Sequence, residues 1–278
     1  AHRSAALLGH GGLMMGPIKK YIELFISFFK ASLISELAFR FNLASRFFTD
    51  ILWYAAQLSV FEVLFRHTDS MNGWGLDETR VFMGVLFVTD AVYMLLFSEN
   101  LDKLGQKIRR GDLDLLLVKP VSSQFMLSFQ KVSVAYIGNL VFSIGWLLWA
   151  IFQIPTVSPL SVLWLVVTVP MSVAIIYCIR FMTAATALFL TKADAVNYIW
   201  YQLYRLGTRP DSFYPAILRY FVLLVLPLAF LASVPSQIIL GKSSPMMLAA
   251  GYVLALFILK LANWFWNRGL RVYGSASS

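Results

Sequence analysis

Reactive side chains are scarce in this sequence, and their spacing argues against catalysis. His67 is the only histidine outside residues 1–16, so no histidine pair exists for metal binding or acid–base chemistry. The single cysteine, Cys178, lies in an apolar run, where a small buried hydrophobic residue is expected. No Gly-x-Ser-x-Gly motif of a serine hydrolase occurs. We therefore expect neither a catalytic residue nor a metal site in this chain.

One short stretch matches the end of a phosphate-binding loop. The residues Gly241-Lys242-Ser243 have the required types, but the full motif needs a glycine five positions before Gly241, where Ser236 stands. The motif also needs a preceding strand and a following helix, and here Pro245 follows almost at once. We therefore expect no cofactor in this chain, and ATP is not expected to bind here.

The stretch RRGDLDLLLVKP, from Arg109 to Pro120, combines charge with a run of leucines. Upstream of it, Leu101, Leu104 and Ile108 share one face of a predicted short amphipathic helix. Gly111 ends that helix, Asp112 can cap a second one that contains Leu113 and Asp114, and Pro120 limits its length. Two short helices with an apolar side suit docking into a groove of a partner protein. A solvated loop whose leucines rest on the membrane fits the pattern equally well.

Two charged residues stand out because they lie inside apolar segments, where charge is costly and marks a functional candidate. Asp90 and Arg180 have opposite signs and similar expected depths, so they can form an ion pair. In the alternative arrangement, Arg180 extends to the interface and Asp90 forms hydrogen bonds with neighbouring helices. We favour these structural roles over a substrate or proton site.

The composition identifies the elements that must position these residues as membrane-spanning helices. Of the 278 residues, 59% are hydrophobic and 13% are charged, compared with about 25% charged in soluble domains. A helix needs about 20 apolar residues to cross the hydrocarbon. The sequence therefore predicts an all-α integral membrane protein with six transmembrane helices, at Phe47–Phe65, Val81–Phe97, Phe125–Phe152, Leu160–Leu190, Ala216–Val234 and Met246–Trp266.

The basic residues predict the orientation of these helices. If the N-terminus is cytoplasmic, the inner segments contain 17 Lys and Arg residues and the outer segments contain 3. Basic residues collect on the cytoplasmic side, so both termini are predicted to be cytoplasmic. The same rule accounts for the net charge of +9 without nucleic acid as a partner. The second inner loop contains NYIWYQLYRL, residues Asn197–Leu206, which we interpret as a short interfacial helix.

The N-terminal region divides into two parts. Residues 1–16 do not begin with Met and resemble nothing downstream, so we interpret them as a leader or start remnant. Residues 17–278 form a single predicted transmembrane domain. Its first part, Ile18–Arg46, is amphipathic, with Lys20, Glu23 and Lys30 on one face, and it is predicted to lie in the membrane interface.

Three segments of the chain resemble a family of bacterial ABC exporter permeases, the six-span subunits of type-two ABC exporters. These are Lys19–Leu43, the IRRGDLDLLLVKPVS stretch at Ile108–Ser122, and the ending WNRGLRVYGSASS at Trp266–Ser278. The second is the most specific. The resemblance implies that the N-terminal helix connects at the interface and that the first cytoplasmic loop contains a coupling helix for a separate ATPase.

The resemblance also implies a function and partners. Two permease subunits, identical or related, would assemble with an ATPase dimer that binds ATP and Mg²⁺, in the bacterial inner membrane. The site residues would then be a coupling set of Leu101, Leu104, Ile108, Arg109, Arg110, Gly111, Asp112, Leu113, Asp114 and Pro120. The cargo is open: the aromatic, sparsely charged spans suit an amphipathic or lipid-like molecule, and they suit plain packing against lipid equally well. The alternatives are a membrane-embedded lipid-modifying enzyme and a secondary carrier.

Overall fold

The computed structural model describes residues 17–38, 40–190, 193–244 and 246–273, and within these residues it is helical without a β-strand. The predicted leader, residues 1–16, lies outside them. The main helices are α1 (Pro17–Leu37), α2 (Arg40–Phe65), α3 (Leu76–Tyr93), α4 (Glu99–Asp102), α5 (Leu104–Arg109), α6 (Asp112–Leu117), α7 (Ser123–Phe129), α8 (Tyr136–Phe152), α9 (Trp164–Ala185), α10 (Ala193–Tyr204), α11 (Ala216–Tyr220), α12 (Ser233–Ile239) and α13 (Met246–Val272).

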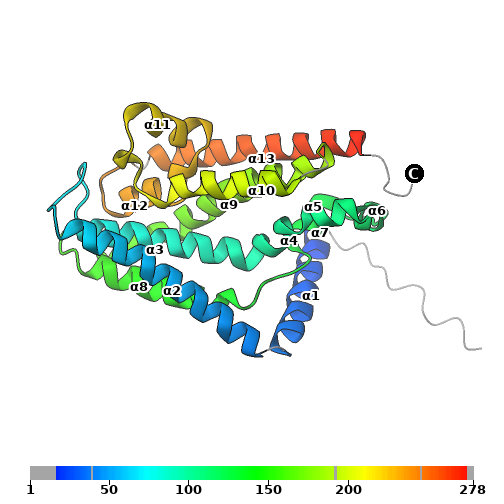
Figure 1. Cartoon of the computed structure of the whole chain (residues 1–278), viewed down its shortest axis with the longest axis horizontal. Coiled ribbons are helices and arrows are strands. Elements are labelled where there is room, and N and C mark those ends of the chain that lie inside the picture. Colours follow the sequence, from blue (N-terminus) through cyan, green and yellow to red (C-terminus); the bar gives the residue numbers. More distant parts are fainter. Residues whose placement is uncertain (1–16, 39, 191–192, 245, 274–278) are drawn as a thin grey trace, which may run out of the picture.

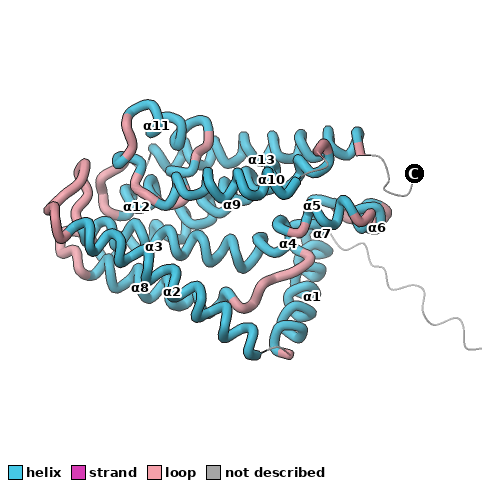
Figure 2. The backbone as a smooth tube through the Cα atoms, in the orientation of Figure 1, coloured by secondary structure: helices cyan, strands magenta, loops and turns pink. Residues whose placement is uncertain are grey.

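Short π and 3₁₀ turns extend several of these helices. Two are π-helical, at Met94–Ser98 and Phe221–Val225, and the others are 3₁₀ turns at Pro159–Leu163, Thr186–Leu188, Arg205–Thr208, Asp211–Phe213 and Leu228–Phe230. Figure 2 shows that most of the loops between helices gather at the two ends of an elongated bundle.

Four stretches of helix are long and apolar enough to cross a membrane: Leu43–Phe65, Leu76–Arg109, Leu160–Leu188 and Met246–Val272. They coincide with the first, second, fourth and sixth predicted spans. The predicted third span is divided into α7 and α8, because the intervening backbone bonds elsewhere: Ser133 N donates to Leu95 O at 2.8 Å. The predicted fifth span is broken into α11, the following π and 3₁₀ turns, and α12.

Helix α10 takes a place in the bundle that the sequence did not predict. It was expected to lie in the interface, but it packs against α9 and runs along the bundle (Figure 1). The chain after α10 stays near the loop that joins α2 and α3, since Asn72 Nδ2 donates to Ser212 O at 2.8 Å. Arg209 and Arg219 therefore lie toward the end of the bundle that contains Lys242. Arg205 and Arg209 both line a cavity. If these two are counted on neither side and Arg219 on the outer side, the predicted ratio of 17 to 3 basic residues becomes 14 to 4.

Helix α3 is central and α2 is peripheral. Of the most apolar window in Leu76–Arg109, 78% is buried within the chain, compared with 11% for Leu43–Phe65. The contact of α3 with α8 is close, because a Cβ on Gly84 would lie 2.9 Å from the Leu147 Cα atom. Apolar side chains of α2, among them Phe48, Leu52 and Val60, remain exposed. Lipid or another subunit must cover them.

Helix α1 begins near α4 and α7 and crosses the end of the bundle at a steep angle to the long helices (Figure 1). One face packs on α7, with Tyr21 against Phe125 at 4.7 Å and Phe25 against Phe129 at 5.6 Å between ring centroids. A second face exposes hydrophobic residues, and a third is polar. A helix is present where the amphipathic helix Ile18–Arg46 was predicted, but it ends at Leu37 rather than at Arg46, because the chain turns there and α2 begins at Arg40. The exposed hydrophobic residues of α1 are Ile18, Ile22, Ile26, Ile34 and Leu37.

Candidate functional sites

The segment Glu99–Pro120 forms the three short helices α4, α5 and α6, which we call the loop helices. Two helices separated at Gly111 were predicted here; the first is divided into α4 and α5, and the second corresponds to α6. Gly111 has φ 76°, a left-handed conformation that glycine adopts without a Cβ penalty. Gly111 is itself the N-cap of α6, so Asp112 is the first helical residue and not the predicted cap. The loop helices lie at the same end of the bundle as the end of α13 (Figure 1).

The predicted apolar face of the loop helices is turned into the chain. Leu101, Leu104 and Ile108 share a face as expected, and all three are buried. Leu113 is 0% exposed, and Leu116 is also buried. These side chains join the hydrophobic core around α9. Leu113 therefore stabilises the fold of this chain itself, and it is not available to a partner protein.

A different set of side chains is exposed on the loop helices, and we call it the loop tip: Leu115, Leu117 and Val118. Leu115 is 69% exposed and Val118 is 82% exposed. Arg109, Arg110, Asp112, Lys119 and Pro120 are exposed around it. Hydrophobic residues that protrude beside basic residues form a small amphipathic surface, of the kind that docks into a groove.

Arg180 is paired with Asp102, which corrects the predicted pair with Asp90. Arg180 Nη2 lies 2.6 Å from Asp102 Oδ1, and the side chains are 1% and 35% exposed. Arg180 also lies over the rings of Trp200 and Tyr201 at 6.0 Å. The correction has a simple cause: the helix that follows α3 continues past Ser98 into α4, and this brings Asp102 next to α9.

Asp102 connects several parts of the chain. Besides Arg180 on α9, it accepts hydrogen bonds from Ser98 Oγ at 3.1 Å and from Tyr201 Oη on α10 at 3.2 Å. Its carboxylate therefore joins the loop helices to both α9 and α10. A displacement of α4 would be transmitted to these two helices through charged and hydrogen-bonded contacts.

The start of α4 is attached to the link between α7 and α8. Glu99 pairs with Lys131 at 2.6 Å and accepts a hydrogen bond from Ser133 Oγ at 3.0 Å. Asn100 Nδ2 donates to the carbonyls of Ser128 and Lys131 at 2.9 and 2.6 Å. The end of the loop segment is attached to α1, because Lys20 Nζ donates to Pro120 O at 2.9 Å. The loop helices are thus held at both ends.

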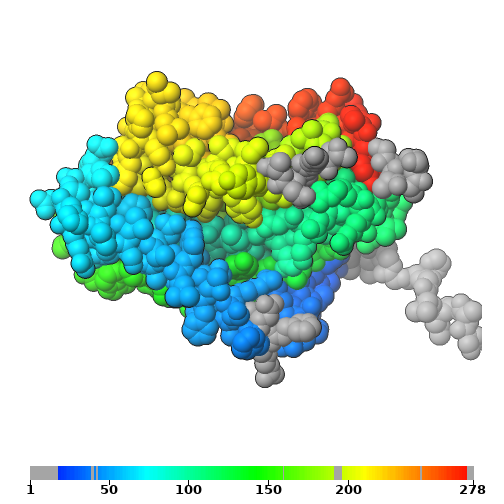
Figure 3. Space-filling model, in the orientation of Figure 1, coloured from blue at the N-terminus to red at the C-terminus, as the bar shows by residue number. Residues whose placement is uncertain are grey.

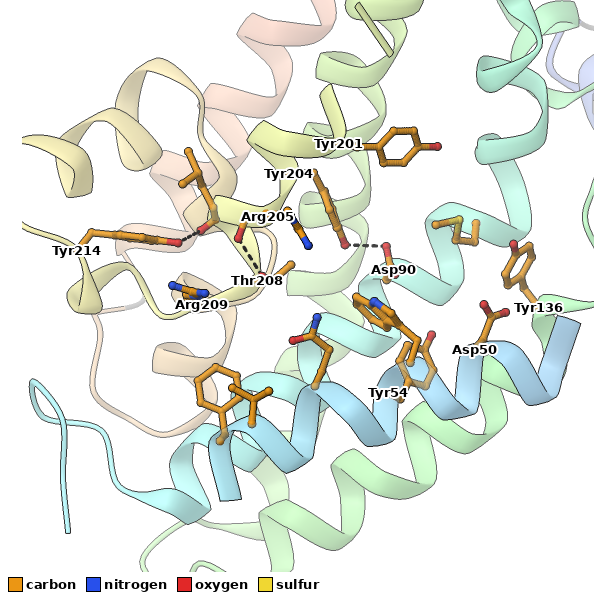
Figure 4. A pocket seen from close by; sticks show the side chains of 16 residues that line it. Asp50, Tyr54, Asp90, Tyr136, Tyr201, Tyr204, Arg205, Thr208, Arg209 and Tyr214 are labelled. Atoms are coloured by element: carbon orange, nitrogen blue, oxygen red, sulfur yellow. Dashed lines mark hydrogen bonds between the residues drawn. The ribbon is translucent and has the colours of Figure 1, made fainter. Parts of the chain in front are cut away.

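A second site is the aromatic cavity between α2, α3 and α10, of about 730 Å³ (Figure 4). Asp50 and Asp90 contribute carboxylates to it, and Arg205 and Arg209 contribute guanidinium groups. Figure 4 shows Arg209 on the side away from Asp50. Six aromatic residues with polar atoms lie between and around these charges: Trp53, Tyr54, Tyr136, Tyr201, Tyr204 and Tyr214.

Asp90 lies in this cavity rather than beside Arg180. Tyr204 Oη donates to Asp90 Oδ1 at 2.7 Å, so Asp90 bonds to a neighbouring helix, which was the alternative expected from the sequence. At the other side, Tyr214 Oη donates to Leu206 O at 3.0 Å. Burial raises the pKa of the Tyr214 hydroxyl, so it remains a proton donor at neutral pH. Aromatic rings with charges of both signs can bind an amphipathic molecule by stacking and hydrogen bonding.

Sequence reasoning did not identify Asp102, Glu99 and Asn100 as structural residues. They appeared as the polar side of an amphipathic helix, a pattern that solvated residues produce equally well. The signal for the aromatic cavity was similarly weak, since its tyrosines are spread over four separate segments. Among the described residues, no group of three or more His, Cys, Asp or Glu side chains could hold a metal ion.

Comparison with known proteins gives one family. The family model described as "ABC-2 family transporter protein" matches residues 51–277. No curated protein matches the chain, and no solved structure matches it.

Proposed function

Because this chain belongs to the ABC-2 family of transporter proteins and is a membrane-spanning permease, we propose that it is the permease subunit of an ATP-driven exporter of the bacterial inner membrane. ATP and Mg²⁺ would be bound and ATP hydrolysed in a separate ATPase dimer, and this chain would perform no catalysis. The family match over residues 51–277 is the observation that carries the proposal.

The loop helices supply a route for coupling. The loop tip would contact the ATPase, with Arg109 and Arg110 steering the approach. Asp102 would then pass a displacement of the loop to α9 and α10, because it binds Arg180 and Tyr201 directly. The contact of Lys20 with Pro120 would couple the same displacement to α1. The docking residues proposed now are Leu115 and Val118, because the predicted Leu113 is buried.

We keep six membrane crossings in the proposal, but we assign the third and the fifth of them to different residues than the sequence predicted. Helix α10 with its 3₁₀ extension would replace Ala216–Val234 as the fifth crossing, and α8 would be the third. The course of α10 along the bundle in Figure 1, and its packing against α9, support this. The segment from α11 to α12 would then lie at the outer end, and both termini would be cytoplasmic.

Cysteine labelling with a membrane-impermeant maleimide tests this topology. Asn72→Cys, Ser244→Cys and Ala216→Cys are expected to react in intact cells, whereas Gln106→Cys should react only after permeabilisation. Ala216 separates the two assignments of the fifth crossing, since the earlier one places it at the cytoplasmic end. The native Cys178 is buried, so it should remain unlabelled as an internal control. Labelling of Gln106→Cys in intact cells would refute the orientation.

A second permease subunit is proposed to cover α2. Figure 3 shows α2 and α10 on the same face of the molecule, and the aromatic cavity lies between the two helices, with the exposed Val60 of α2 in its lining. The cavity would then line a pathway between two permeases, and its aromatic and charged side chains suit an amphipathic cargo.

Co-purification tests the function. The chain, expressed from its native genome with an affinity tag, is expected to retain a phosphate-loop ATPase, and the complex should contain two permease and two ATPase subunits by mass. Vanadate should inhibit its ATP hydrolysis in proteoliposomes. A chain that purifies from crosslinked native membranes without any ATPase would contradict the proposal, and the secondary carrier would then be favoured.

A further inference from the structure

A second hollow, separate from the aromatic cavity, lies between α3, α7, α9 and α13. We call it the α13 groove; its volume is about 840 Å³, and it shares no lining residue with the aromatic cavity. Its walls are almost entirely aliphatic and aromatic. The apolar lining residues are Val92, Leu96, Phe97, Phe125, Phe129, Val169, Pro170, Val173, Ala174, Tyr177 and Leu259.

The polar lining residues of the α13 groove gather toward one end. Ser122 and Gln124 lie at the start of α7, where Ser122 N donates to Tyr21 Oη of α1. Trp266 Nε1 donates to Ser123 Oγ at 3.1 Å, which places the last turns of α13 beside this end. Asn263 and Lys260 precede Trp266 by one and two turns of the helix. The groove thus has a polar mouth near α1 and an apolar interior toward Pro170.

Lys260 has no protein counter-charge at this mouth. It is exposed, it lies inside the candidate span Met246–Val272, and among the described residues it forms no ion pair or hydrogen bond. No carboxylate lines the groove. By contrast, Lys103, Lys131 and Lys242 each pair with a glutamate. A lysine within the hydrocarbon is costly unless its ammonium reaches the headgroups or binds an anion.

Further donors at the mouth are suited to an anion. The Asn263 Oδ1 atom accepts a hydrogen bond from Asn267 Nδ2 at 3.3 Å, which leaves the Asn263 amide nitrogen directed to other acceptors. Ser122 Oγ accepts from Phe125 N, so its hydroxyl proton can be donated. A cation and two donors beside an apolar channel match the two parts of an anionic lipid: a phosphate and an acyl chain.

We propose that the α13 groove binds an anionic phospholipid of the leaflet in which α1 lies. The phosphate binds Lys260, Asn263 and Ser122, and one acyl chain lies against Phe125, Phe129 and Val173. A lipid is the occupant because the groove is lined by the candidate spans Leu76–Arg109, Leu160–Leu188 and Met246–Val272, which a bilayer must surround, and because no carboxylate in its lining compensates the charge of Lys260. The site is distinct from the proposed cargo pathway.

Native mass spectrometry of the purified, delipidated protein tests whether the charge of Lys260 contributes to lipid binding. Phosphatidylglycerol and phosphatidylcholine with identical acyl chains are added at equal concentration. Wild type is expected to prefer phosphatidylglycerol, and Lys260→Gln should weaken that binding about tenfold, as loss of a charge-assisted contact predicts. Lys260→Arg should retain it. Lys30→Gln, an exposed lysine outside the groove, is the matched control and should bind like wild type.

A second variant, which retains Lys260, tests whether the apolar interior of the α13 groove binds the acyl chain. Leu259→Trp fills the α13 groove from an exposed position, and Leu256→Trp lies three residues away on the same helix outside it. Only Leu259→Trp should reduce binding of both lipids. Unchanged phosphatidylglycerol binding by Lys260→Gln or by Leu259→Trp would overturn the proposal. Displacement of the lipid by millimolar inorganic phosphate would also overturn it, since that result would indicate a site for a free anion.

Discussion

Asp102→Asn is expected to lower the free energy of unfolding in detergent by about 3 kcal/mol, because it leaves the Arg180 guanidinium buried without a counter-charge. Arg180 is 1% exposed, so water cannot replace the lost carboxylate. Its Nε atom already has no hydrogen-bond partner among the described residues, which makes Asp102 its main compensation. Thermal unfolding of the purified protein, followed by circular dichroism, measures the loss.

The control for this prediction is an exposed ion pair. Asp77 pairs with Arg80 at 2.7 Å and is 52% exposed, and Arg80 retains Glu62 when Asp77 is changed. Asp77→Asn should therefore cost less than about 1 kcal/mol. The double variant Asp102→Asn/Arg180→Gln should be more stable than Asp102→Asn alone, because no unpaired charge remains. Strictly additive losses would show that the two side chains do not interact.

The double variant Leu115→Asp/Val118→Asp is expected to abolish stimulation of ATP hydrolysis by cargo and to weaken ATPase binding by more than tenfold. Each side chain can contribute about 1–3 kcal/mol when it is buried in a partner. Both are exposed on the permease alone, so the fold of the permease should be preserved. ATPase pull-down and ATP hydrolysis in proteoliposomes measure the two effects.

Two further variants define what this result means. Leu113→Asp should instead lower the thermal stability of the permease, because Leu113 is fully buried in its own chain. Arg110→Gln should change ATPase binding by less than about 1 kcal/mol, as an exposed charge contributes little. If the Leu115/Val118 double variant binds and couples its ATPase like wild type, the loop tip is not the docking surface.

The sequence by itself determined the class of the protein and much of its helical layout. Apolar runs longer than the hydrocarbon thickness have one solution, a helix that satisfies its own backbone, so α2, α3, α9 and α13 could be located. Gly111 was also readable as a break, because a left-handed backbone is sterically cheap only for glycine.

Only the tertiary structure decided the direction in which each face points and the partner of each charge. An amphipathic pattern shows that Leu101, Leu104 and Leu113 share an apolar environment, but it does not distinguish the chain's own core from another protein. Arg180 pairs with Asp102 rather than with Asp90, because the depth of a side chain within a bundle depends on where its helix starts, and α4 continues the line of α3. Tyr204 and Asp90, which are 114 residues apart in the sequence, meet only because α10 packs lengthwise in the bundle. Such long-range contacts depend on packing among all the helices, and no local sequence window contains that information.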